Sequence, residues 1–102
     1  MKRAVLLLAL LLSAQVQAAP FASGNAAEGK KFFDQNHCNR CHVDMMGGDG
    51  SEIFTRPDHK VRSASQLVSQ INFCSGNAGI RITHQDEQNL AAYLNQRYYK
   101  LP

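Results

Sequence analysis

The chain shows helical spacing of apolar residues in three stretches, the first of which follows Asn25. Asparagine is a favoured N-cap, and Glu28 stands three residues later, where a capping box requires it. This helix is expected to extend to about Asn36, with Phe32 and Phe33 as its bulky apolar residues. Its interior glycine, at position 29, costs roughly 1 kcal/mol relative to alanine and indicates the close approach of another backbone.

A second helix is expected to begin at Ser63, with a glutamine three residues later as another capping box. Its apolar face recurs at i, i+4 and i+7 through Leu67, Ile71 and Cys74. The polar and glycine residues 75–79 are expected to end it.

The last helix is expected to begin at Thr83, with Asp86 near its N-terminus, where the helix dipole favours an acidic side chain. Its inner face repeats at positions 90, 93, 94 and 97. The tyrosines at positions 98 and 99 are interpreted as packing residues. No stretch alternates with the period of a strand, so the pattern predicts an all-α fold.

Residues 43–62 show no periodicity and contain three glycines and a proline, so they are predicted to form a loop. A loop of this length is unusual in a small domain, and long loops in compact domains tend to wrap around something.

The N-terminal residues have the pattern of a secretory signal peptide. Lys2 and Arg3 precede an apolar run, and Val16-Gln17-Ala18 is a small-residue cleavage site. The apolar run is shorter than the roughly 20 residues that a membrane-spanning helix needs. We expect residues 1–18 to be removed and residues 19–102 to form one exported domain without a stable membrane span. The alternative is an uncleaved N-terminal anchor.

Removal of the leader changes the charge of the protein. The whole chain has 11 Lys and Arg against 8 Asp and Glu, a net charge of +3, but two of the basic residues belong to the leader. The 84 residues that remain carry 9 basic and 8 acidic side chains, so the basic pI does not favour nucleic acid as a partner. A domain of this size usually needs a further stabilising element, such as a disulfide or a bound metal, besides its hydrophobic core.

The three cysteines are an odd number for an exported protein, and two of them lie in Cys38-Asn39-Arg40-Cys41-His42. Cys-x-x-Cys-His is the attachment signature of c-type haem. Its spacing lets two thiols reach two vinyl groups of one macrocycle, while the imidazole that follows binds the iron. Haem c is therefore expected on Cys38 and Cys41, with His42 as the proximal axial ligand.

The cysteine pair is compatible with two other uses. A thioredoxin-like redox site requires a βαβ setting, which the sequence does not predict. A structural zinc site requires four ligands and would need Cys74 and a histidine in addition.

The order of these elements resembles the class I cytochrome c family from about Asn25 to Tyr99. The stretches 47–56 and 93–95 are also similar to a subgroup of small bacterial single-haem cytochromes. The resemblance implies a small cytochrome c fold of about three to four helices around one covalent haem. It also implies that the first and last helices cross where Gly29 and Phe33 meet Tyr93.

The sequence departs from this family at the sixth iron ligand. Most members use a methionine from the loop before the last helix, and residues 75–82 contain none. The side chains that remain open as the sixth ligand are Met45, Met46, His59, Cys74 and His84. Cys74 is also compatible with a buried core thiol, since free cysteine is among the most buried residue types.

Two further donors are less favoured, and the sixth site itself is open to another interpretation. His37 precedes the motif on the wrong side, and Asn77 has the position of the family's methionine but only an amide. A vacant sixth site is the remaining possibility.

The expected function is one-electron transport in the periplasm between transient redox partner proteins, without enzymatic activity of its own. One alternative is a haem protein that binds a small ligand at a vacant or labile sixth site, with Asn72, Asn77 or His84 as the distal polar group. The other is a haem subunit of a larger exported oxidoreductase.

Overall fold

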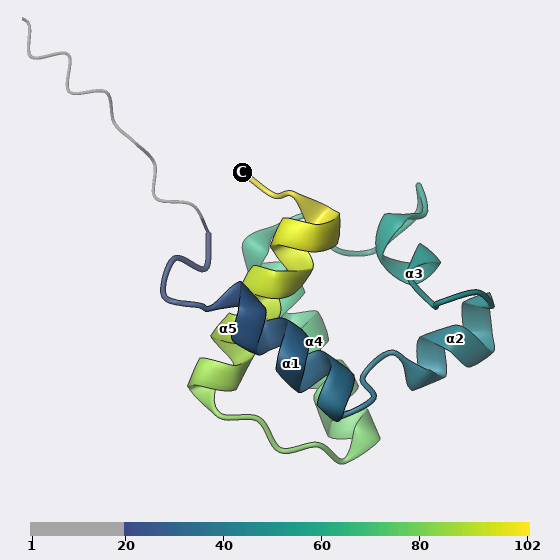
Figure 1. Cartoon of the computed structure of the whole chain (residues 1–102). Coiled ribbons are helices and arrows are strands. Elements are labelled where there is room, and N and C mark those ends of the chain that lie inside the picture. The colour runs from purple at the N-terminus through teal and green to yellow at the C-terminus, as the bar shows by residue number, and fades with distance from the viewer. Residues whose placement is uncertain (1–19) are drawn as a thin grey trace, which may run out of the picture.

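The computed structural model describes residues 20–102, and within this range the chain is helical and has no strand (Figure 1). The predicted signal peptide, residues 1–18, lies outside the described residues. The all-α prediction is confirmed, although two short helices and a π-helical end add to the three to four expected helices. The elements are α1 (Ala26–Gln35), α2 (Arg40–Met46), α3 (Glu52–Thr55), α4 (Ala64–Ala78), α5 (His84–Leu94) and η1 (Asn95–Tyr99).

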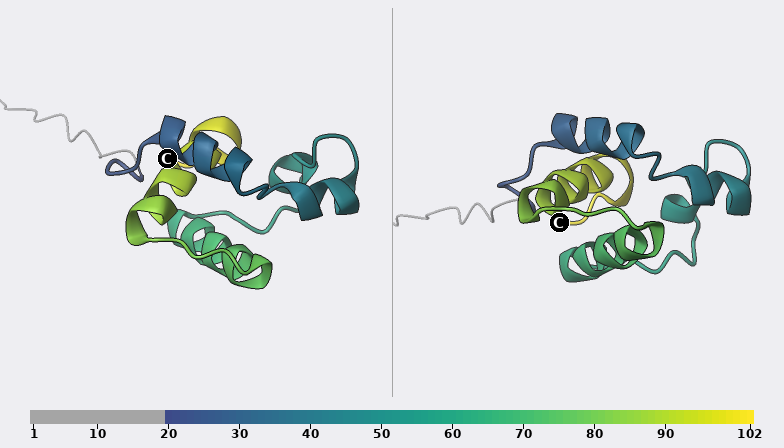
Figure 2. Two further views of the ribbon diagram at one scale, coloured as in Figure 1. Left: turned by 60° about the horizontal axis from the view of Figure 1, so that its bottom comes forward. Right: turned by 90° about the horizontal axis from the view of Figure 1, so that it is seen from below.

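Helices α1 and α5 cross (Figure 2). Gly29 lies at this crossing, against Asn89 and Tyr93 of α5. A Cβ atom on Gly29 would overlap the backbone carbonyl of Asn89 and lie 2.9 Å from Cβ of Tyr93. One turn later, the ring centroids of Phe33 and Tyr93 are 5.6 Å apart. The expected crossing is therefore confirmed, and only glycine permits this approach of the two backbones.

The N-terminus of α1 is capped as expected on one side only. The side-chain oxygen of Asn25 accepts the N–H of Glu28 at 3.0 Å. The reciprocal bond of a capping box is absent, because the N–H of Asn25 donates instead to Oδ1 of Asn89 at 2.8 Å. The cap therefore also ties α1 to α5.

Helix α5 has the complete capping box that its sequence predicts. Thr83 Oγ1 accepts the N–H of Asp86 at 3.0 Å, and the Asp86 carboxylate accepts the N–H of Thr83 at 2.9 Å. After Leu94 the helix widens into η1, and the side chain of Asn95 accepts the N–H of Leu101 at 2.7 Å.

Helix α4 begins after Ser63 as predicted, and Ser63 Oγ accepts the N–H of Gln66. The side chain of Gln66 accepts the N–H of Arg62 at 2.6 Å, so this capping box is also open. The helix continues to Ala78, further than expected, and ends at Gly79 with a left-handed φ of +70°. Leu67 is 1% exposed and forms the centre of the core with its neighbours.

The prediction of a loop over residues 43–62 is wrong in two places. The second half of α2 and the whole of α3 fall within it. Both helices are too short to show a period, which explains why the pattern missed them. They lie together at one side of the molecule (Figures 1 and 2), and α3 reaches η1 through Phe54, which is 6% exposed.

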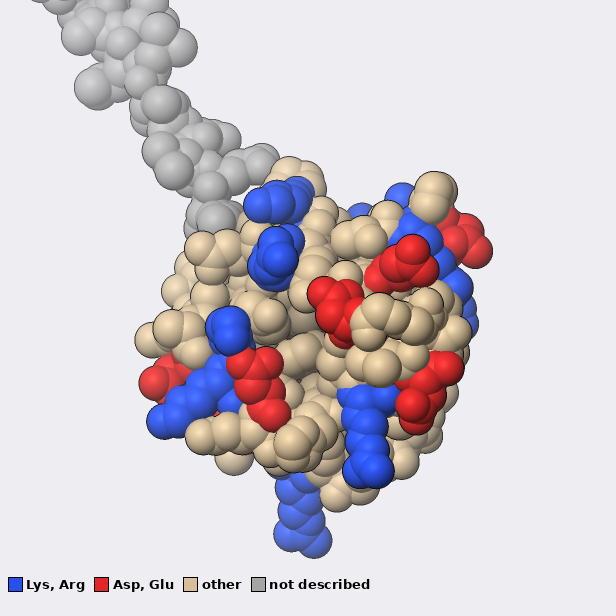
Figure 3. Space-filling view, turned by 45° about the vertical axis from the view of Figure 1, so that its right-hand side comes forward, with Lys and Arg blue, Asp and Glu red and all other residues tan. Residues whose placement is uncertain are grey.

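Acidic and basic side chains are interspersed on the face that Figure 3 shows. A mixed surface of this kind has no large field of one sign. Within residues 20–102, no helix combines the length and the apolar character that crossing a membrane would require.

Candidate haem attachment site

The cysteine motif lies where the chain leaves α1 and enters α2. Cys38 belongs to the connecting turn, in which its N–H donates to the carbonyl of Phe33 at 3.0 Å and His37 has a positive φ of 53°. Cys41 and His42 follow in the first turn of α2. The side chains of the motif are therefore held by a short connection anchored on α1.

Both motif cysteines are free thiols in different surroundings. Cys38 is half-buried and packs against the core, whereas Cys41 is exposed. Burial is the main cause that raises the pKa of Cys38 above its ordinary value. Cys38 is thus held as a neutral thiol at the edge of the core.

The imidazole of His42 is held in one orientation by Asn39. Nδ1 of His42 lies 2.8 Å from Oδ1 of Asn39. Nδ2 of Asn39 donates to the carbonyl of Asp49, so the oxygen of this amide must face the histidine. An amide oxygen only accepts, so Nδ1 carries the proton, and Nε2 is left with its lone pair.

Burial lowers the pKa of His42 below its ordinary value. A neutral ring with a free Nε2 is the form in which histidine binds a metal. Within residues 20–102, Nε2 of His42 has no hydrogen-bond partner that would compete for it.

Gly50 closes the loop that supports Asn39. It is buried and has a φ of +82°. A Cβ atom there would lie 2.6 Å from Nδ2 of Asn39 and 2.8 Å from the backbone nitrogen of Val43. The carbonyl of Asp49 can therefore reach Asn39 only because residue 50 has no side chain.

An aromatic cluster around Phe54 covers one side of His42. The ring of Phe54 meets His42 edge to face, with centroids 5.2 Å apart, and stacks on Tyr98 at 4.7 Å. Tyr99 meets Phe54 edge to face, and burial raises the pKa of Tyr99 to about 12. The interpretation of both tyrosines as packing residues is confirmed.

The motif residues fit the chemistry of covalent haem. Two free thiols separated by two residues supply the two attachment points. His42, neutral and with a bare Nε2, supplies one axial bond. The apolar rings beside it supply the low-polarity surroundings that a macrocycle requires.

The two methionines considered as sixth ligand lie at the far end of α2. The side chain of Met45 points outward, and the residue is 65% exposed. Met46 is half-buried, with its sulfur 3.9 Å from Nη1 of Arg56. Both follow His42 by about one turn on the same short helix, so they lie on the side of the imidazole and do not face it from the opposite side.

Each of the remaining three candidates has a polar neighbour outside the motif. Nδ1 of His59 lies 2.6 Å from the carbonyl of Arg56. Cys74 is half-buried, and its sulfur accepts from the amide of Gln70 at 3.2 Å. The side chain of His84 is 82% exposed and lies 3.6 Å from the Glu87 carboxylate. Within residues 20–102, none of the five side chains makes a hydrogen bond to a residue of the Cys-x-x-Cys-His motif.

Of the three polar residues considered for a distal group, two approach the carboxylate of Glu87 in α5. Asn72 donates to Glu87 at 2.8 Å, the same residue that His84 approaches. Asn77 is exposed near the end of α4.

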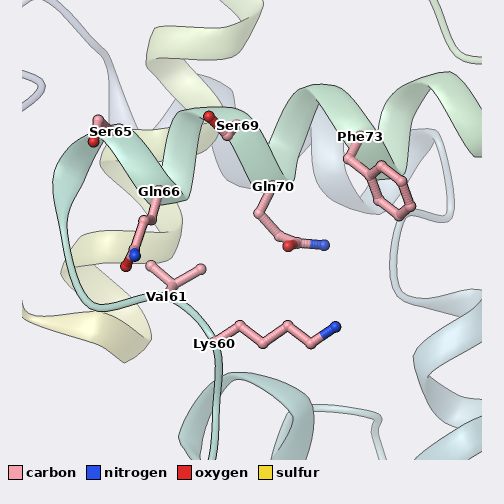
Figure 4. A pocket seen from close by; sticks show the side chains of 7 residues that line it. All are labelled: Lys60, Val61, Ser65, Gln66, Ser69, Gln70 and Phe73. Carbon is pink, nitrogen blue, oxygen red and sulfur yellow. The ribbon is translucent and has the colours of Figure 1, made fainter.

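An open pocket of about 440 Å³ lies along α4 instead, and Figure 4 shows Gln66, Gln70 and Phe73 directed toward it. No residue of the Cys-x-x-Cys-His motif lines it. A second pocket, of about 480 Å³, lies beside the motif and includes Asn39 in its lining.

The alternative uses of the cysteines have no geometric support in the part of the chain that the structure describes. Residues 20–102 contain no cluster of three or more His, Cys, Asp and Glu side chains, so the zinc alternative lacks a ligand set. The same residues contain no strand, which a βαβ redox site would need.

No family model, no curated protein and no solved structure matches this chain. The resemblance to class I cytochrome c therefore rests on the residues quoted above.

Sequence reasoning missed the residues that support His42. The attachment signature assigns no role to Asn39, and Gly50 and Phe54 fall within the stretch predicted as a loop. The available signal was the spacing of Asn39, three residues before His42, which places their side chains on one face of a helix.

Proposed function

We propose that this protein is an exported, single-haem c-type cytochrome that carries one electron at a time between redox partners. The observation that supports this most is the motif, in which two free thiols precede a histidine that is neutral and has its Nδ1 already bonded to Asn39. A neutral imidazole with an unengaged Nε2 is the form in which histidine binds a metal, and this supports haem iron as the group bound there.

The residues would divide the binding as follows. The thiols of Cys38 and Cys41 would each add across one vinyl group, the sulfur bonding to one carbon and the proton to the other, so no oxidant is consumed. His42 would bind the iron through Nε2. Bound haem supplies the one-electron cycle between ferric and ferrous iron. Phe54 would exclude water from the histidine side.

The partners proposed are redox proteins of the same compartment, which we take to be the periplasm. Encounters between such proteins are brief and bury less than about 1,200 Å². The mixed surface charge of Figure 3 suits several weak partners better than one tightly bound polyanion.

The test is expression of residues 1–102 in a host that matures c-type haem. Denatured protein should retain haem, and its mass should increase by one haem. Cys38→Ala and Cys41→Ala should each lose one thioether bond, and His42→Ala should abolish the low-spin spectrum. Cys74→Ser is the matched control and should retain covalent haem. Absence of covalent haem from the wild-type chain would contradict the proposal.

A second candidate function is the binding of a small ligand opposite His42. The placement of the possible sixth ligands favours it, since Met45 and His84 are exposed and Met46, His59 and Cys74 have other partners. Ferrous spectra with and without carbon monoxide distinguish the two. Unchanged low-spin bands support electron transport, whereas a shift on adding carbon monoxide supports ligand binding.

A further inference from the structure

We propose that Asn39, inside the motif, is a positioning residue that sets how strongly His42 donates to the iron. This inference rests on the proposed function and adds a residue whose side chain acts through another. The claim concerns the hydrogen bond from Nδ1 of His42 to Oδ1 of Asn39, which is 2.8 Å long.

The orientation of the Asn39 side-chain amide is fixed by a second hydrogen bond, on the side away from His42. Its NH₂ group donates to the carbonyl of Asp49. If the amide turned over, its oxygen would face that carbonyl and its NH₂ would face Nδ1 of His42. Two acceptors would then oppose each other, so the observed orientation is the one that satisfies both ends.

The loop that carries Asp49 is itself fixed by Gly50. Residue 50 packs against Nδ2 of Asn39 and against the backbone of His42 and Val43 at the start of α2. The chain of contacts therefore runs from Gly50 and Asp49 through Asn39 to His42, and it is separate from the covalent attachment points.

The chemical consequence concerns the electron density on the ring. A hydrogen bond donated by Nδ1–H makes the imidazole a more basic ligand through Nε2. A more basic ligand stabilises ferric iron relative to ferrous iron and so lowers the reduction potential. Loss of the Asn39 oxygen should raise the potential without detaching haem.

The first experiment measures the reduction potential of haem-loaded variants. Asn39→Ala should shift it to more positive values while covalent haem is retained. Gly50→Ala should shift it in the same direction, because the added methyl group displaces the Asn39 amide. The double variant should show no more than the shift of Asn39→Ala alone, since both changes break one link.

Gly48→Ala is the matched control for Gly50→Ala. Gly48 lies in the same loop with a φ of +55°, and a Cβ atom there has no neighbour within 4 Å. It introduces similar backbone strain without touching Asn39, so its potential should equal that of the wild type. Equal potentials for wild type and Asn39→Ala would overturn the inference, as would a Gly48→Ala shift equal to that of Gly50→Ala.

A second measurement separates this inference from the proposed function. If the host delivers the wild-type chain without haem, the proposed function fails, and ¹⁵N spectra of that same chain report the His42 tautomer. The wild type should then carry the proton on Nδ1, and Asn39→Ala should move it to Nε2. A wild-type proton on Nε2 would overturn the role of Asn39 independently of haem.

Discussion

Helices α1 and α2 both follow an asparagine, and the two asparagines bind different groups. The backbone of Asn25 is extended (φ −111°, ψ 110°), which places its side chain over the N–H of Glu28 three residues later. The backbone of Asn39 is helical (φ −91°, ψ 0°), and its side chain reaches the imidazole of His42, also three residues later. The same sequence spacing thus stabilises one helix and orients the imidazole of His42 on the other.

The two helices also differ in how many of their residues are buried. Helix α1 buries Gly29 and Phe33 against α5, whereas α2 has no buried residue. Helix α2 is held by side-chain contacts at its start and by Phe54 of α3. The packed pair α1 and α5 therefore supports the less buried α2, which carries Cys41 and His42. Substitutions in the two regions should have different consequences.

The largest loss of stability is expected from Gly29→Val at the α1–α5 crossing. A branched side chain would overlap the Asn89 carbonyl and force the two helices apart. We expect a loss of about 4 kcal/mol or more in the free energy of unfolding. Urea denaturation followed by circular dichroism measures it.

Gly76→Ala is the control within a helix that has no such crossing. A Cβ atom at position 76 meets nothing within 4 Å, and alanine favours the helix by about 1 kcal/mol. This variant should therefore be more stable than the wild type. Equal destabilisation by both substitutions would show that the crossing is not the cause.

The next effect is expected from Phe54→Ala in the α2–α3 region. Removal of a ring that packs on His42, Tyr98 and Tyr99 should cost about 3 kcal/mol in unfolding free energy. It should also expose His42 to water and broaden its ring resonances in NMR spectra. A loss below about 1 kcal/mol would mean that the cluster contributes little packing.

A smaller effect is expected from Asn25→Ala, which removes the cap of α1. The N-cap bond to Glu28 is worth about 1 kcal/mol, and thermal unfolding should show its loss. The reduction potential of the haem-loaded protein should stay unchanged, in contrast to Asn39→Ala. A potential shift in Asn25→Ala would blur the distinction between the two asparagines.

The smallest effect is expected from His84→Ala. An exposed side chain with one distant carboxylate neighbour should change the unfolding free energy by less than about 0.5 kcal/mol. The spectrum of bound haem should not change either. A changed spectrum would identify His84 as the sixth ligand despite its place in this structure.

The helix starts were predictable because capping is local. Asn25, Ser63 and Thr83 each bond a backbone N–H three residues later, so a short window contains the whole signal. The end of α4 was misplaced because Gly76 is accommodated inside the helix and only Gly79 adopts the left-handed conformation that ends it.

The cysteines and His42 were predictable as candidates because their spacing is itself the signal. The residues that hold His42 in place were not predictable. The bond from Asn39 to Asp49 spans 10 residues and depends on the loop folding back at Gly50. Helix α3 has four residues, too few for any period. Such contacts depend on tertiary structure, which residue patterns do not describe.

The bond between Asn25 and Asn89 joins residues 64 positions apart, so it cannot form until most of the chain is available. A chain that emerges N-terminus first, from a ribosome or a translocation channel, presents α1 long before α5 exists. Contacts of high sequence separation form late and slowly. Cys38, Cys41 and His42 therefore leave the channel together with α1, before the α5 segment that packs on α1 is available.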